Sequence, residues 1–291
     1  MRKGAQATHP RQGFRSEQSL QVNDPETGAV EIQASSGGAM PLLAMVALAH
    51  PVAVPAELFV AEFQRISGAA LGSGAVQQND QTLVIAIAGG VAAVSLMEAP
   101  IPWGELSGPC EAAWWWPEAQ ERLKPHLAHL LIAHVPQPGL AQKTPLERHI
   151  LLSQLAATAI TVCGGLGVYW CGGTLVYPPD EFCQKVRGLS DEALFPELWI
   201  DMRFAANADG SVQFFTTGLA AMGLPELEIR ATRRTPRDVL DFCYGLILYM
   251  LTEGTQIAAG DTIGRTESER MTVAYGPSQH HAAGVMLLSD A

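Results

Sequence analysis

Apolar residues in this chain alternate between short continuous runs and runs with helical spacing, starting near residue 40. Leu42–Ala49 is an apolar run of strand length, and Pro55–Ile66 follows with helical spacing. Thr82–Ala88 and Val91–Met97 flank Gly89-Gly90, a pair typical of a two-residue hairpin turn. A helical or irregular stretch over 103–116, a helix over 117–124 and a strand over 128–135 come next. The order β-α-β-β-α-β predicts a ferredoxin-like half over residues 40–143.

Residues 144–291 form the second predicted half, which opens with a clear helix start. Thr144-Pro145-Leu146-Glu147 is a capping box with proline at the first helical position, and the helix is predicted to run to about Cys163. Thr235-Pro236 predicts the start of a second long helix, 237–253, which Gly254 ends. A short helix is expected over 179–186, a strand or hairpin over 167–177, and strands over 197–205, 211–217, 225–231, 271–275 and 285–288. We therefore expect an α+β protein, its second half a mainly antiparallel sheet with helices on one face.

The first 39 residues differ from the rest of the chain. They hold four basic and four acidic residues, are rich in Gln, Ser, Gly and Thr, and show no sustained periodicity. Such a segment buries too little apolar surface to offset its ordering entropy, so residues 1–39 are predicted to be a disordered leader. Met40 stands directly before the first strand, which raises the alternative that translation starts there.

Charge and cysteine content restrict the class of protein. The 291 residues carry a formal charge of −11, which argues against a nucleic-acid partner because phosphate binding needs a basic face. No apolar stretch is long enough to span a bilayer, so no membrane association is expected. The five cysteines are widely spaced without a CxxC pair, a pattern that favours free thiols in a reducing cytoplasm.

Several short islands of sequence resemble the bacterial domain of unknown function 4261. They are Ala99–Trp103, Gly108–Cys110, Trp114–Pro117, Gly167–Trp170, Phe215–Leu219, Gly223–Glu228 and Gly260–Gly264. Cys171 departs from the Gly expected after the Tyr-Trp pair, and Arg265-Thr266 from the Ser expected after the last island. The family supplies no chemistry to transfer. Its association with contact-dependent toxins and their immunity genes implies a protein partner, for instance a toxin or a secretion-system component.

The acidic residues of the second half are the first candidates for chemistry. Glu226 and Glu228 have strand spacing and are predicted to share a face, and Asp261 lies in a glycine-flanked loop. Paired carboxylates could hold a divalent metal or divide into an acid and a base. Glu267 and Glu269 extend this set. The alternative is a solvated strand face plus a turn aspartate, which the absence of a metal-ligand spacing favours.

The tryptophan-rich stretch 101–117 is the most unusual part of the sequence. Trp114, Trp115 and Trp116 cannot all point into one core, because neighbouring positions on a helix or strand diverge. At least one indole is therefore expected to be partly exposed or to line an interface. The alternative is that the stretch fills the seam between the two halves.

Other motifs give little support for catalysis. His129 and His134 differ by an odd number within a predicted strand and should face opposite sides, and His280-His281 lies in a polar loop. No nucleotide-binding or nucleophile-elbow motif occurs, and Thr216 and Thr217 have no histidine nearby in sequence. We therefore predict no cofactor and no resident metal.

Two functions remain open. One is a non-catalytic cytoplasmic binding protein, of immunity or adaptor type, that docks a basic protein through an acidic, tryptophan-bearing surface. The other is a metal-assisted hydrolase or transferase built on the carboxylates, with Tyr169 or Trp170 lining its pocket. The binding protein is preferred. Its predicted binding residues are Trp103, Glu105, Glu111, Trp114, Trp115, Tyr169, Trp170, Thr217, Glu226, Glu228, Asp261 and Thr262.

Overall fold

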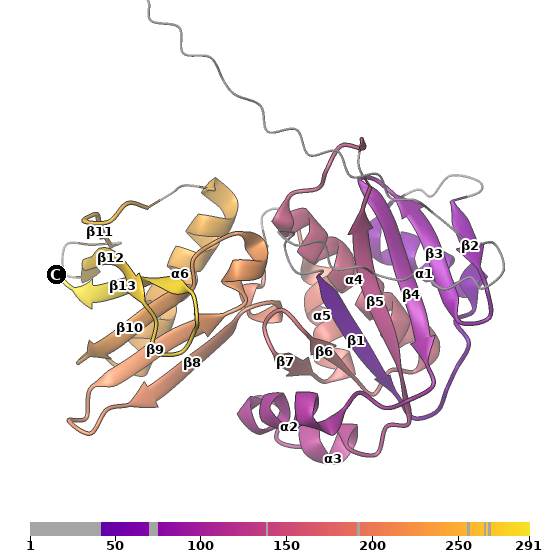
Figure 1. Ribbon diagram of the computed structural model, residues 1–291, viewed down its shortest axis with the longest axis horizontal. Coiled ribbons are helices and arrows are strands. Elements are labelled where there is room, and N and C mark those ends of the chain that lie inside the picture. Colours follow the sequence, from indigo (N-terminus) through magenta and orange to yellow (C-terminus); the bar gives the residue numbers. More distant parts are fainter. Residues whose placement is uncertain are drawn as a thin grey trace, which may run out of the picture. The chain divides into compact units, whose positions relative to one another are not determined.

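Two β-sheets and six α-helices make up the part of the chain that the computed structural model describes (Figure 1). The described residues are 42–69, 75–137, 139–190, 193–254, 257–264, 266 and 269–291. The predicted leader 1–39, the possible start at Met40 and the candidate Glu267 lie outside them. Residues 39–291 form one compact unit, and the chain is an α+β protein as expected.

The first sheet has seven strands in the order β2-β3-β4-β5-β1-β6-β7, and all neighbours are antiparallel. Its strands are β1 Leu43–Leu48, β2 Val76–Gln78, β3 Thr82–Ile87, β4 Gly90–Met97, β5 Ala128–Pro136, β6 Gly167–Trp170 and β7 Leu175–Tyr177. The predicted hairpin at Gly89-Gly90 joins β3 to β4.

The ferredoxin-like prediction for residues 40–143 is wrong in its strand order. That arrangement would place β1 next to β4, whereas β5 lies between them, with Val94 opposite Ile132 and Val46 opposite Leu130. The physical reason is the composition of β5, whose residues 128–134 are apolar or histidine and almost all buried on both faces. A strand of this kind belongs in the centre of a sheet rather than at its edge.

The boundary between the sheets also differs from the predicted division at residue 143. β6 pairs with the free edge of β1, with Val168 opposite Val46, and β7 continues the same sheet. The helix that follows the capping box, α4 Pro145–Cys163, packs against β1, β5 and the helix α1 Ala56–Ser67. The short helix α5 Pro179–Gly188 packs on α4. Residues 144–188 therefore complete the first sheet, because its central strands need cover that α1 alone does not supply.

The opposite face of this sheet carries the tryptophan-rich segment. Helices α2 Trp103–Ala112 and α3 Ala119–Leu123 bury Leu106 and Leu123 against Ala47 of β1 and Tyr169 of β6. Because successive strand residues face opposite sides, Val46 and Val168 lie in the core beneath α4 instead. Trp103 and Trp116 thus pack in a small second core, whereas Trp115 packs against both this core and the main one.

The second sheet has six strands in the order β11-β12-β13-β10-β9-β8 and is mixed, because β10 and β13 run parallel. Its strands are β8 Asp201–Ala206, β9 Val212–Thr217, β10 Leu227–Thr232, β11 Thr262–Ile263, β12 Met271–Pro277 and β13 Gly284–Asp290. The helix α6 Pro236–Glu253 lies behind these strands in Figure 1, and two 3-10 helices, η1 Pro196–Leu198 and η2 Leu219–Met222, flank β8 and β9.

Candidate functional site

Glu226 is a buried carboxylate held entirely by internal donors. Its Oε2 accepts a hydrogen bond from the Thr216 hydroxyl at 2.7 Å, and its Oε1 accepts from the backbone N–H groups of Gly218 and Ala220 at 2.8 and 3.0 Å. The side chain therefore joins the end of β9 and the start of η2 to the chain just before β10. With the residue only 7% exposed, it has no position from which to meet a ligand.

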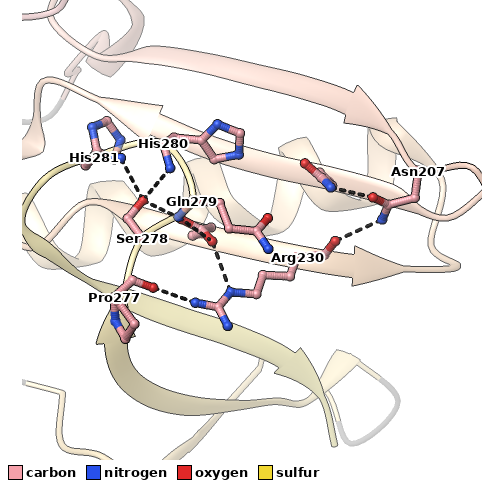
Figure 2. Close-up of polar contacts among 9 residues, drawn as sticks. Asn207, Arg230, Pro277, Ser278, Gln279, His280 and His281 are labelled. Carbon is pink, nitrogen blue, oxygen red and sulfur yellow. Dashed lines mark hydrogen bonds and ion pairs between the residues drawn. The ribbon is translucent and has the colours of Figure 1, made fainter.

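Glu228 takes a different set of partners, of which Figure 2 labels Arg230, Ser278 and Gln279. Ser278 Oγ donates to its carboxylate at 2.6 Å, the Gln279 backbone N–H at 3.1 Å and Arg230 Nε at 3.2 Å. Burial by itself would raise the pKa of Glu228, but these hydrogen bonds and the charge of Arg230 outweigh it and lower the pKa below its ordinary value. The ionised carboxylate thus ties the loop after β12 to the sheet.

The same loop places two histidines over β9. The backbone N–H groups of His280 and His281 both donate to Ser278 Oγ at 2.9 Å, and the His280 ring stacks on Phe215 with 3.7 Å between ring centroids. His281 Nε2 lies 2.7 Å from the Thr216 carbonyl oxygen, to which it donates. Among the described residues Ser278 meets the histidines only through their backbone N–H groups, so this is a hydrogen-bonded turn and not a serine–histidine pair poised for nucleophilic attack.

Asp261 and Thr262 are exposed and lie apart from the two glutamates. Asp261 Oδ2 accepts from the Ala258 backbone N–H at 2.8 Å, and its carbonyl oxygen accepts from Val273 at 2.9 Å, so it shapes the turn before β11. Thr262 pairs with Thr272 of β12, and Thr217 pairs with Asp201 of β8.

The predicted carboxylate set therefore does not come together as one site. Glu226, Glu228 and Asp261 each accept from different donors. Across the described ranges, no three His, Cys, Asp or Glu side chains lie close enough to hold a metal ion. The strand-spacing inference failed because Glu226 precedes β10, where strand alternation no longer sets side-chain direction. The hydrogen bonds from Ser278 and Gln279 to Glu228 were not predicted, because these partners are 50 and 51 residues away in sequence.

The three adjacent tryptophans diverge as predicted. Trp116 is buried in the second core, with its ring against Gly167 of β6, where a Cβ would lie 2.7 Å from the indole. Trp115 is half-buried, donates through Nε1 to the Val176 carbonyl oxygen at 3.1 Å and stacks on Tyr177. Trp114 is 80% exposed and meets Trp115 edge-on at 5.9 Å between centroids. The expectation that at least one indole is exposed is confirmed.

An open hollow lies beside the exposed indole, between the end of α2 and α3. Its lining residues are Cys110, Glu111, Ala113, Trp114, Pro117, Glu118, Gln120 and Glu121. The three glutamates are exposed, none of their carboxylates forms an ion pair or hydrogen bond with another described residue, and no Lys, Arg or His lines the hollow. Burial, followed by the charge of Glu111, raises the pKa of the Cys110 thiol to about 11. The thiol therefore stays protonated and lines the hollow without acting as a nucleophile.

The remaining predicted residues divide between the two faces of the first sheet. Trp103 is half-buried in the second core, where Lys124 Nζ lies 5.8 Å from its ring centroid, and Glu105 is exposed on the same helix. Tyr169 packs in this core, where burial, Cys171 and Glu105 raise its pKa to about 12. Trp170 faces the main core and is fully buried against His149, which removes it from any shared surface with Tyr169.

Fold and contacts together define an α+β protein with an antiparallel and a mixed sheet, an acidic tryptophan-bearing hollow on the first and a latched polar loop on the second. A family model described as "Domain of unknown function (DUF4261)" matches residues 215–286, and the resemblance stated from the sequence is confirmed over that range. The matched residues include Phe215, Glu226, Glu228, Ser278 and both loop histidines, whereas the Trp114 hollow lies outside them. No curated protein and no solved structure matches the chain.

None of the described helices combines the length and apolarity that crossing a bilayer requires.

Proposed function

We propose that this protein is a non-catalytic cytoplasmic binding protein, of adaptor or immunity type, that docks a basic segment of a partner protein in the hollow beside Trp114. One observation carries the proposal: an indole that is 80% exposed borders a hollow lined by three unpaired glutamates and no basic residue. The alternative of a metal-assisted hydrolase or transferase has no comparable support, because Glu226, Glu228 and Asp261 are each occupied by separate internal donors.

The chemistry of the hollow selects for a cation. An indole face attracts a lysine or arginine head group by about 0.5 to 2 kcal/mol, more as the contact loses water. Glu111, Glu118 and Glu121 add charge attraction without any competing internal partner in the described chain. The overall charge of −11 also speeds the approach of a basic partner and repels acidic ones.

The hollow is held in shape before any partner arrives. His126 Nε2 accepts from the Ile101 backbone N–H at 2.7 Å and His129 Nδ1 donates to the Ala99 carbonyl oxygen at 2.8 Å, which fixes the approach to α2. Trp116 anchors the segment in the second core, and Trp115 packs against both this core and the main one. A rigid support of this kind lowers the entropy lost on binding, as expected of a docking site.

The proposal is tested by fluorescence anisotropy with two synthetic probes, labelled octalysine and labelled octaglutamate. Octalysine should bind the full chain, and its affinity should fall steeply between low and high salt. The Trp114→Ala variant and the Glu118→Gln/Glu121→Gln variant should each bind octalysine about tenfold or more weakly than the parent chain. Tyr249→Ala is the matched control, since Tyr249 is a 46% exposed aromatic on α6. Equal binding of octalysine by Trp114→Ala and the parent chain, or equal binding of octaglutamate, contradicts the proposal.

A further inference from the structure

His134 is a buried histidine without a hydrogen-bond partner. It continues the inward-facing series Ala128, Leu130 and Ile132 of β5, close to the end of that strand, and is 2% exposed. Neither ring nitrogen has a partner among the described residues. Buried polar atoms are nearly always satisfied, and an unsatisfied one costs about 1 to 3 kcal/mol, so this ring calls for a ligand.

Arg148 shows the same deficit beside it. This residue lies in the first turn of α4, which packs on β5, and its buried Nε also has no partner among the described residues. Neither Arg148 nor the neighbouring Lys143 forms an ion pair with a described residue, although both are partly exposed. The charges of both reach the ring of His134, where burial first and then Arg148 and Lys143 lower its pKa to about 4. The ring is therefore neutral, with one nitrogen free to donate.

Positive charge is concentrated at this end of the first sheet. Lys143 packs on the β3–β4 turn, 3.4 Å from the position of a Cβ on Gly89, and the helix start adds the positive end of the α4 dipole. A cation in the first turn of a helix is unfavourable unless an anion offsets it. The adjacent carboxylate, Glu147, accepts from the Thr144 backbone N–H at 2.6 Å in the helix cap, and this hydrogen bond, with a smaller contribution from the charge of Lys143, lowers its pKa.

We propose that His134 and Arg148 form an anion site that binds a small oxyanion, a phosphate or carboxylate group, with Lys143 adding charge at its mouth. The planar guanidinium matches two oxygens of such a group, and the His134 ring N–H donates to a third oxygen of a phosphate or to a remaining lone pair of a carboxylate oxygen. Arg148 is partly exposed, whereas His134 is buried. This site is independent of the Trp114 hollow, which binds the opposite charge.

Thermal unfolding of the full chain tests the site with inorganic phosphate and acetate, each against sodium chloride at matched ionic strength. A saturating oxyanion should raise the unfolding midpoint by about 2 to 4 °C, and the more effective of the two salts identifies the oxyanion class. The shift should vanish in Arg148→Met, which keeps the aliphatic stem, and persist in Arg122→Met, a matched exposed arginine on α3. Phosphate or acetate should also move the His134 ring resonances saturably in a nuclear magnetic resonance titration.

Three results overturn the proposal. The first is a midpoint that neither oxyanion raises beyond chloride, and the second is an undiminished shift in Arg148→Met. The third is a crystal structure grown in saturating phosphate with only water between His134 and Arg148. Because His134→Phe replaces an unsatisfied ring by an apolar one, it should fold and yet lose the response to oxyanion. A retained response in that variant counts equally against the site.

Discussion

The Thr216 hydroxyl donates to the buried Glu226 carboxylate at 2.7 Å and accepts from the Leu227 backbone N–H at 2.8 Å. One threonine thus bridges the side chain and the following amide of the same segment, at the point where β9 ends and β10 begins. Because each group in this cluster satisfies another, removing one leaves the others buried without partners.

Replacing Glu226 should therefore damage the fold. Glu226→Ala leaves the Gly218 and Ala220 N–H groups and the Thr216 hydroxyl without their acceptor, at an expected cost of about 3 kcal/mol in the free energy of unfolding. Asp261→Ala is the control, because this exposed residue should lose less than about 1 kcal/mol. Urea denaturation of both variants measures the difference. A neutral Glu226→Ala would show that the cluster is not a structural support.

The hydrogen bonds that Ser278, Gln279 and Arg230 donate to the Glu228 carboxylate predict that the free energy of unfolding falls at acid pH. The pKa of Glu228 is lowered in the folded state, so its stabilisation is fully present above the pKa of the unfolded chain and is lost as the pH falls through the folded value. Ser278→Ala removes the 2.6 Å hydrogen bond and should flatten the fall in stability below about pH 4.5. It should also speed hydrogen exchange at Gln279, whose N–H binds the same carboxylate. An unchanged exchange rate would mean that the loop is held by other contacts.

His149 predicts a second, separate loss in weak acid. Burial, partly offset by the hydrogen bond to the Pro145 carbonyl oxygen, lowers its pKa to about 4, whereas an unfolded histidine titrates near 6.5. Between these values the unfolded chain binds the extra proton, so stability should rise with pH across that window, by about 3 kcal/mol in total. His149→Phe should remove its share of the slope, as followed by urea midpoints from pH 7 to 4, whereas the share of His134, whose pKa is also lowered to about 4, should remain. The exposed His50 provides the control, as His50→Phe should leave this slope in place.

The neighbouring tryptophans Trp114 and Trp116 should behave in opposite ways. Trp116→Ala empties a buried site in the second core and should cost about 3 to 5 kcal/mol of unfolding free energy. Trp114→Ala removes an 80% exposed ring and should change stability by no more than about 0.5 kcal/mol. Chemical denaturation distinguishes the two. If Trp114→Ala were as costly as Trp116→Ala, its indole would be a structural element and not a free docking surface.

Local signals in the sequence determined most of the elements. Thr144 and Glu147 form the predicted capping box, with both reciprocal hydrogen bonds present, and Thr235 caps α6 through the Asp238 backbone N–H. The divergence of Trp114, Trp115 and Trp116 followed from the geometry of adjacent residues alone. These features depend on atoms a few residues apart, so the order of residue types is sufficient to predict them.

Only the tertiary structure decided which strands pair and what lies over each polar side chain. Hydrophobic periodicity shows that β5 and β6 are buried, but it does not say that they flank β1, because pairing depends on partners far along the chain. In the same way, strand spacing could mark Glu228 as inward or outward but could not supply Ser278 and Gln279. Periodicity reports which face of an element is apolar, whereas the neighbours of that face are set by packing of the whole chain.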